Sequence, residues 1–215
     1  MLSEHMTNTI ENRQITLYPA KEAGQPFIVF NDFSDEDSEL IEELNKMNCP
    51  DINLLTVIPL DWDTDMTPWP APPLSKKDEG FKGGADEYLT LLTQKIIPKA
   101  LENVRGTPCW FGIAGYSLSG LFSLYALYRT TVFKRAASMS GSLWYPGFLE
   151  FVKERDLLQN PDKIYLSLGD AEKMSRHPML KTVEDNTRAV AETYALKGVP
   201  VTFELNPGNH FKEPG

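Results

Sequence analysis

Cysteine and histidine are scarce in this chain. Its 215 residues include two cysteines and three histidines. Cys49 and Cys109 lie far apart in the sequence, and their surroundings show no metal-ligand spacing. We therefore expect reduced thiols, a cytoplasmic location and no bound metal ion.

Long apolar runs and an excess of positive charge are also lacking. No stretch approaches the roughly 18 consecutive apolar residues that a membrane-spanning helix needs. The first twenty residues contain Glu4, Glu11 and Arg13 and no apolar run, so they predict no secretory signal. Because 21 Lys and Arg face 30 Asp and Glu, the formal net charge is −9. Nucleic acids and anionic membranes repel such a surface, so neither is expected as a partner.

The remaining composition predicts one α/β domain with a single large core, since 41% of the residues are hydrophobic. Strand-like apolar runs alternate with stretches of helical spacing, which favours a mostly parallel central sheet with helices on both faces. Residues 1–14 show no periodicity, and we expect a mobile or strand-pairing arm ahead of a domain over 15–215. The expected strands are 15–18, 26–30, 53–60, 110–114, 135–140, 163–168 and 199–205. The first expected helix begins at a cap, Ser34 or Ser38, and ends at Met47. A second covers 88–101, where Pro98 should kink it or end it early. Further helices are expected over 118–128, 148–156 and 180–194.

The segment Gly115-Tyr116-Ser117-Leu118-Ser119 lies between an apolar strand-like run and a helical pattern. A chain that turns from strand to helix so sharply needs small residues two positions before and two after the apex. Gly115 and Ser119 meet this need, with Ser119 in place of the last glycine of a G-x-S-x-G nucleophile elbow. Ser117 is therefore the expected nucleophile, against the alternative that the cluster only caps a helix.

Two other serines, Ser119 and Ser140, lie in similar small-residue segments. Ser119 would need a small residue at position 121, where the chain has Leu121. Ser140 has small neighbours, but the segment from Leu143 to Gly147 that follows it cannot begin a helix. Both are weaker candidates than Ser117.

A serine nucleophile needs a base, and histidine suits that role because its pKa lies near 6.5. His5 lies in the arm and His177 precedes a proline, whereas His210 follows the last predicted strand. We expect His210 to be the base, because the order serine, acid, histidine is typical of α/β-hydrolases. The acid that orients it is expected after the strand 163–168, where both Asp170 and Glu172 occur. Glu172 is the preferred candidate for this acid, and Asp170 is almost as good a candidate.

Further site residues are expected on loops. The oxyanion would be held by the backbone N–H of Leu118 and by that of Phe33, with Ser34 as the alternative. Trp62 and Trp69 lie in the proline-rich segment 61–73 and are expected to line the pocket mouth, as is Trp144. The alternating Asp61, Asp63 and Asp65 do not form an EF-hand, because Met66 and Pro72 stand where that loop needs glycine and glutamate; we expect these acids to cap and brace the loop.

Taken together, the motifs IVFNDF, DWDTDMTPWPAPP, GYSLSG, SGSLWYP, SLGDAE and NPGNHF resemble the esterase D-like "putative esterase" branch of the α/β-hydrolases. That branch includes enterochelin (siderophore) esterases, S-formylglutathione hydrolase and mycolyltransferases. The resemblance runs from about Ile15 to the chain end. It implies an α/β-hydrolase fold, a Ser117, His210 and Asp170 or Glu172 triad, no metal or organic cofactor, and hydrolysis of a small-molecule carboxylic ester through an acyl-enzyme.

Hydrolases of this fold usually carry a helix after the histidine loop, and this chain ends at Gly215 without one. The expectation is that the sequence is shortened, or that the arm or a second copy of the chain in a homo-oligomer covers that face. Two alternatives to the esterase remain: an acyltransferase of the same fold, and a catalytically impaired binding protein.

Overall fold

The computed structural model describes residues 2–33, 37–59 and 61–210. It contains one eight-stranded sheet in the order β1-β2-β4-β3-β5-β6-β7-β8. The strands are β1 (Met6–Ile10), β2 (Arg13–Tyr18), β3 (Phe27–Asn31), β4 (Asn53–Val57), β5 (Phe111–Tyr116), β6 (Arg135–Met139), β7 (Lys163–Gly169) and β8 (Val201–Asn206). From β4 to β8 neighbouring strands are parallel, while β1 and β2 add an antiparallel edge. The mostly parallel sheet expected from the alternating pattern is therefore present.

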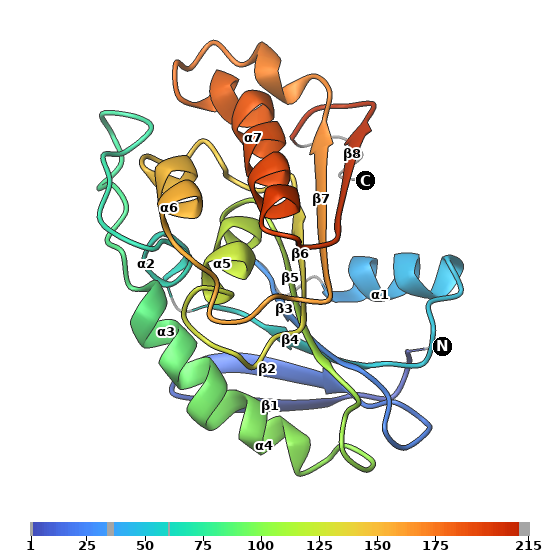
Figure 1. The fold of residues 1–215 in the computed structure, drawn as a ribbon. Helices are drawn as coiled ribbons and strands as arrows, with labels where there is room; N and C mark the ends of the chain where they lie inside the picture. The colour runs from blue at the N-terminus through green and yellow to red at the C-terminus, as the bar shows by residue number, and fades with distance from the viewer. Residues whose placement is uncertain (1, 34–36, 60, 211–215) are drawn as a thin grey trace.

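The helices lie on both faces of this sheet (Figure 1). They are α1 (Asp37–Lys46), α2 (Trp62–Asp65), α3 (Ala85–Leu91), α4 (Ile97–Leu101), α5 (Leu118–Ala126), α6 (Phe148–Glu154) and α7 (Val183–Leu196), with a π-helical turn η1 (Leu92–Ile96) and short 3₁₀ turns η2 (Glu172–Met174) and η3 (Leu180–Thr182). Figure 1 shows α1 on one side of the sheet and α3 to α7 on the other. Within the described residues, no helix combines the length and apolar character needed to cross a bilayer.

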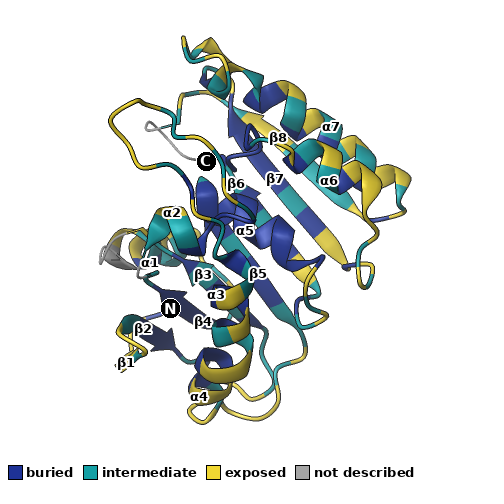
Figure 2. Ribbon diagram, turned by 90° about the vertical axis from the view of Figure 1, so that its left-hand side faces the viewer, coloured by how far each residue is buried: buried dark blue, intermediate teal, exposed yellow. Residues whose placement is uncertain are grey.

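The two faces carry cores of different size. The larger core lies between the sheet and helices α3 to α7, and Val29, Leu55, Ile113 and Leu166 supply its sheet side. On the opposite face Ile41 of α1 packs with a smaller cluster that includes Leu54. Figure 2 shows α5 buried along its length against the sheet, and every one of its nine residues is buried. The turn at Ser117 therefore leads into a fully enclosed helix.

Two local expectations are refined. Within 1–14, the segment expected to be an arm, Met6 to Ile10 form β1, which pairs with β2 through a turn with positive φ at Glu11 and Asn12. Pro98 does not end its helix. The π-helical turn directly precedes α4, which carries Pro98 and continues to Leu101. The expected cap Ser34 and the region of the expected missing helix, 211–215, lie outside the described residues.

Candidate active site

Ser117 occupies the sharp turn between β5 and α5. Its φ of 58° and ψ of −122° are strained for a residue with a side chain. A Cβ atom on Gly115 would lie 2.5 Å from the carbonyl oxygen of Ser119, so only glycine fits there. The Ser119 hydroxyl accepts from the Tyr116 amide and donates to the Tyr116 carbonyl, each at 2.8 Å. Ser119 therefore closes the elbow with two hydrogen bonds that a glycine could not make.

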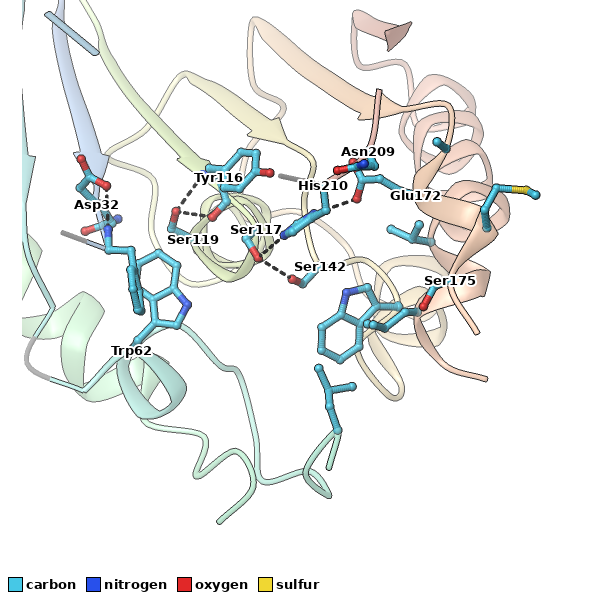
Figure 3. Close-up of a pocket in the computed structure, with 18 residues that line it drawn as sticks. Asp32, Trp62, Tyr116, Ser117, Ser119, Ser142, Glu172, Ser175, Asn209 and His210 are labelled. Atoms are coloured by element: carbon cyan, nitrogen blue, oxygen red, sulfur yellow. Dashed lines mark hydrogen bonds and ion pairs between the residues drawn. The ribbon is translucent and has the colours of Figure 1, made fainter. Parts of the chain in front are cut away.

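His210 lies beside this turn. Its Nε2 atom is 3.1 Å from Ser117 Oγ, and its Nδ1 atom is 2.8 Å from Glu172 Oε2. The Tyr116 ring lies against the imidazole, with ring centroids 5.0 Å apart. Ser117, His210 and Glu172 thus form a hydrogen-bonded row, which Figure 3 shows at the top of the pocket. The structure brings together these three predicted residues from the ends of β5, β8 and β7.

The two candidate acids have different partners. Glu172 is buried and accepts from the amide of Gly169 at 2.9 Å as well as contacting His210. Burial by itself raises the pKa of Glu172, but hydrogen bonds from His210, the Ser140 hydroxyl and the Gly169 amide outweigh it, so the pKa lies below its ordinary value. Asp170 is exposed and accepts from the amide of Gly208 at 3.1 Å. Asp170 therefore braces the histidine loop, and Glu172 faces the imidazole.

The histidine loop is tied to the loop after β7 by backbone contacts as well. The amide of Asp170 donates to the Asn206 carbonyl, and the amide of Ala171 donates to the Gly208 carbonyl, both at 2.8 Å. A Cβ atom on Gly169 would lie 2.7 Å from the Gly208 carbonyl oxygen, so this approach needs glycine. These contacts hold the segment that carries His210 although it lies near the end of the chain.

The backbone N–H groups of the two expected oxyanion donors, Leu118 and Phe33, have different surroundings. Leu118 is the first residue of α5, so its N–H has no acceptor within the helix and lies at the positive end of the helix dipole. The N–H of Phe33 donates to Oδ1 of Asp32 at 2.7 Å, and the Phe33 side chain is 70% exposed. A substrate oxygen at this position would have to replace the Asp32 carboxylate. Ser34, the alternative donor, falls outside the described residues.

A cavity of about 790 Å³ opens beside Ser117. Its walls include Ser117, His210, Trp62 and Trp144 as well as apolar side chains from several elements, namely Phe33, Leu74, Met174, Leu180 and Val183. The Trp62 indole meets the Phe33 ring edge to face, with centroids 5.3 Å apart. Trp62 and Trp144 therefore line the pocket, as expected from the sequence.

The expected place of Trp69 in this pocket is wrong. Its Nε1 atom donates to the Pro146 carbonyl at 2.9 Å, and its ring packs against Tyr125, Tyr145 and Phe151. Trp69 thus anchors the proline-rich segment to the core beneath α5 and α6. An aromatic side chain on a loop can either line a pocket or pack into the core. The local sequence does not distinguish these two placements.

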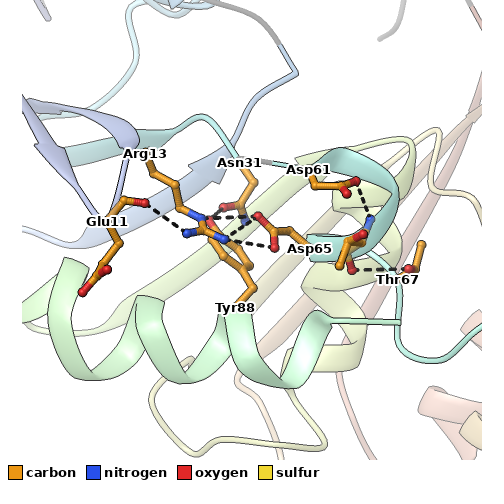
Figure 4. Close-up of polar contacts among 8 residues, drawn as sticks. Glu11, Arg13, Asn31, Asp61, Asp65, Thr67 and Tyr88 are labelled. Carbon is orange, nitrogen blue, oxygen red and sulfur yellow. Dashed lines mark hydrogen bonds and ion pairs between the residues drawn. The ribbon is translucent and has the colours of Figure 1, made fainter. Parts of the chain in front are cut away.

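A polar cluster around Arg13 and Asp65 lies beside the end of β3 (Figure 4). Nη2 of Arg13 lies 2.9 Å from Oδ2 of Asp65, and the two side chains are 13% and 8% exposed. The Tyr88 hydroxyl donates to Oδ1 of Asn31, the last residue of β3. Asp61 caps α2 by accepting from the Thr64 amide at 3.1 Å. Asp61 and Asp65 therefore cap and brace this loop, as expected.

Sequence reasoning missed Ser142, which follows β6. Its Oγ atom lies 3.3 Å from Ser117 Oγ, and its amide donates to the Ser117 carbonyl at 3.0 Å. The residue is buried and lines the cavity. The parallel pairing of β5 with β6 would have been the signal, because it places the loop after β6 beside the elbow.

Comparison with known proteins places these features in context. The model of the family described as "Putative esterase" matches residues 38–212. The protein YbbA of Bacillus subtilis (strain 168) is 29% identical over 209 residues, which cover 92% of this chain and 82% of that protein.

Solved structures resemble the chain in fold. The IroE-like serine hydrolase from Shewanella oneidensis superposes with a TM-score of 0.79 at 18% identity, covering 98% of this chain and 76% of that one. The siderophore hydrolase EstA from Aspergillus nidulans gives a TM-score of 0.73 at 18% identity, covering 97% and 88%. The expected α/β-hydrolase fold is confirmed.

Proposed function

Because the chain belongs to the putative esterase family, we propose that it hydrolyses carboxylic esters through an acyl-enzyme formed on Ser117. The observation that carries the proposal is the row in which His210 lies 3.1 Å from Ser117 Oγ and 2.8 Å from Glu172. This is the arrangement that a serine nucleophile, a general base and an orienting acid require.

In the proposed reaction His210 takes the hydroxyl proton of Ser117 as Oγ attacks the acyl carbon. Glu172 holds the imidazole in the tautomer with a proton on Nδ1 and stabilises the imidazolium that forms. The N–H of Leu118 holds the negative oxygen of the tetrahedral intermediate, joined by the N–H of Phe33 once Asp32 releases it. His210 then gives its proton to the leaving alcohol, and water releases the acyl group by the same steps.

The cavity supports an ester with an apolar or aromatic group. Trp62, Trp144 and Leu180 offer it apolar and aromatic walls beside the nucleophile. EstA of Aspergillus nidulans is a siderophore hydrolase, so siderophore esters belong in the substrate panel beside p-nitrophenyl and feruloyl esters. Rates across chain length and ring size would define the acyl and alcohol groups.

The test compares the wild-type protein with Ser117→Ala. We expect the variant to lose p-nitrophenyl acetate turnover and labelling by a fluorophosphonate probe. Ser123→Ala is the matched control, because the Ser123 hydroxyl is buried and donates to the Ser119 carbonyl. Undiminished labelling of Ser117→Ala would place the nucleophile elsewhere, and an unlabelled wild-type protein would reject the proposed function.

A further inference from the structure

The hydroxyl of Ser142 touches the atom on which the proposed chemistry takes place. Its oxygen lies 3.3 Å from Ser117 Oγ (Figure 3), and the residue is 1% exposed. The hydrogen bond from its amide to the Ser117 carbonyl fixes the loop after β6 against the elbow. The two hydroxyls are therefore held together by the backbone and not only by their own contact.

The direction of this hydrogen bond follows from counting protons. The pKa of Glu172 lies below its ordinary value, so the carboxylate is ionised near neutral pH and accepts from Nδ1 of His210. A neutral imidazole with its proton on Nδ1 has a lone pair on Nε2, which accepts from the Ser117 hydroxyl. Since that hydroxyl has a single proton, the contact between the two serines uses the proton of Ser142.

We propose that Ser142 is a further catalytic residue that donates a hydrogen bond to Ser117 Oγ while this atom loses its proton. The proposal rests on the proposed esterase function. As the Ser117 proton moves to Nε2 of His210, Oγ gains negative charge, and the bond from Ser142 becomes charge-assisted and stronger. The Oγ–C bond forms, the carbonyl electron pair moves to the substrate oxygen, and Ser142 keeps its own proton throughout.

Ser142 contributes to both half-reactions. In acylation it stabilises the negative charge that Ser117 Oγ gains as its proton moves to His210. In deacylation Ser117 Oγ leaves the tetrahedral intermediate while it takes a proton back from His210, and the same hydrogen bond stabilises it. Removing the Ser142 hydroxyl should therefore slow both steps, and a reagent that reacts by attack of Ser117 alone isolates the first.

The experiment measures Ser142→Ala against wild type with a fluorophosphonate, whose reaction repeats the attack of Ser117 without a deacylation step. We expect the maximal inactivation rate to fall about tenfold to a hundredfold with little change in the concentration for half-maximal rate. Burst kinetics with a p-nitrophenyl ester should show that acylation and deacylation both become slower. Ser142→Thr keeps the hydroxyl and is expected to recover part of the rate.

Ser138→Ala is the matched control, because Ser138 is also 1% exposed and lies on β6. It should react at the wild-type rate. Wild-type inactivation of Ser142→Ala, or an equal slowing in Ser138→Ala, would overturn the role of Ser142 while leaving the esterase proposal intact. A wild-type protein that does not react at all would overturn both.

Discussion

His210 Nε2 lies 3.1 Å from Ser117 Oγ although 93 residues separate the two in sequence. Parallel strands bring their carboxyl ends to one edge of the sheet, and both residues follow such ends. We expect His210→Ala to lower kcat by about 10²–10⁴-fold with a small change in KM, because the base acts in the transition state. Steady-state kinetics at neutral pH measures this. His177→Ala is the control and should keep wild-type kcat.

Substitutions of the two acids that follow β7 should lower kcat to different extents. Glu172→Gln should lower kcat by roughly 10⁴-fold, as loss of the orienting acid does in serine proteases, because an amide cannot hold the same imidazole tautomer. Asp170→Asn should lower kcat by less than about tenfold, since an amide oxygen still accepts from the Gly208 amide. The reverse order of the two losses would assign the acid to Asp170.

Acid should destabilise the fold through Glu172. Its folded-state pKa lies below the unfolded value, so the ionised carboxylate stabilises the fold above the unfolded pKa, near 4.3. This stabilisation is lost as the pH falls through the folded pKa. Urea unfolding at pH 7, 4 and 3 should therefore show a steeper fall for wild type than for Glu172→Gln. Parallel curves for the two proteins would contradict the assignment.

Substitution of Trp62 should affect substrate binding, whereas substitution of Trp69 should affect the stability of the fold. Trp62→Ala removes part of the pocket wall, so we expect a higher KM for aromatic esters and little change in the melting temperature. Trp69→Ala removes the packing against Tyr125 and Phe151 and should cost about 3 kcal/mol of unfolding free energy. Kinetics and urea unfolding of both variants measure the difference. A raised KM with unchanged stability in Trp69→Ala would return that residue to the pocket.

The ion pair between Arg13 and Asp65 is largely shielded from water, so breaking one side should be costly. Asp65→Ala leaves the guanidinium without its carboxylate and should lower the unfolding free energy by about 3–5 kcal/mol. Adding Arg13→Met should recover part of this loss, because no buried charge remains. Glu102→Ala removes an exposed pair with Lys99 and is expected to cost less than about 1 kcal/mol. Equal losses for Asp65→Ala and Glu102→Ala would contradict this reasoning.

The parts of the candidate site that could be predicted depend on local backbone geometry or on a residue type that is rare in the chain. The elbow lies within five consecutive residues, where Gly115 and Ser119 meet steric needs that can be stated from the sequence. His210 was identifiable because the chain has only three histidines. The alternation of strands and helices was sufficient for the fold class.

The remaining features depend on tertiary contacts. Asp170 and Glu172 share one loop, and their roles differ because the Gly208 amide faces one and the imidazole faces the other. Trp69 turns to the core through a partner 77 residues away. Ser142 approaches Ser117 only because β5 pairs with β6.

Backbone hydrogen bonds between the loops after β7 and β8 hold His210 beside Glu172. Ser117 directly precedes α5, a helix whose residues are all buried. When the outermost strand β8 loosens, His210 moves away from Ser117 and Glu172, whose own strands stay in the sheet. We therefore expect activity to fall on warming before the core around α5 unfolds, and to return on cooling.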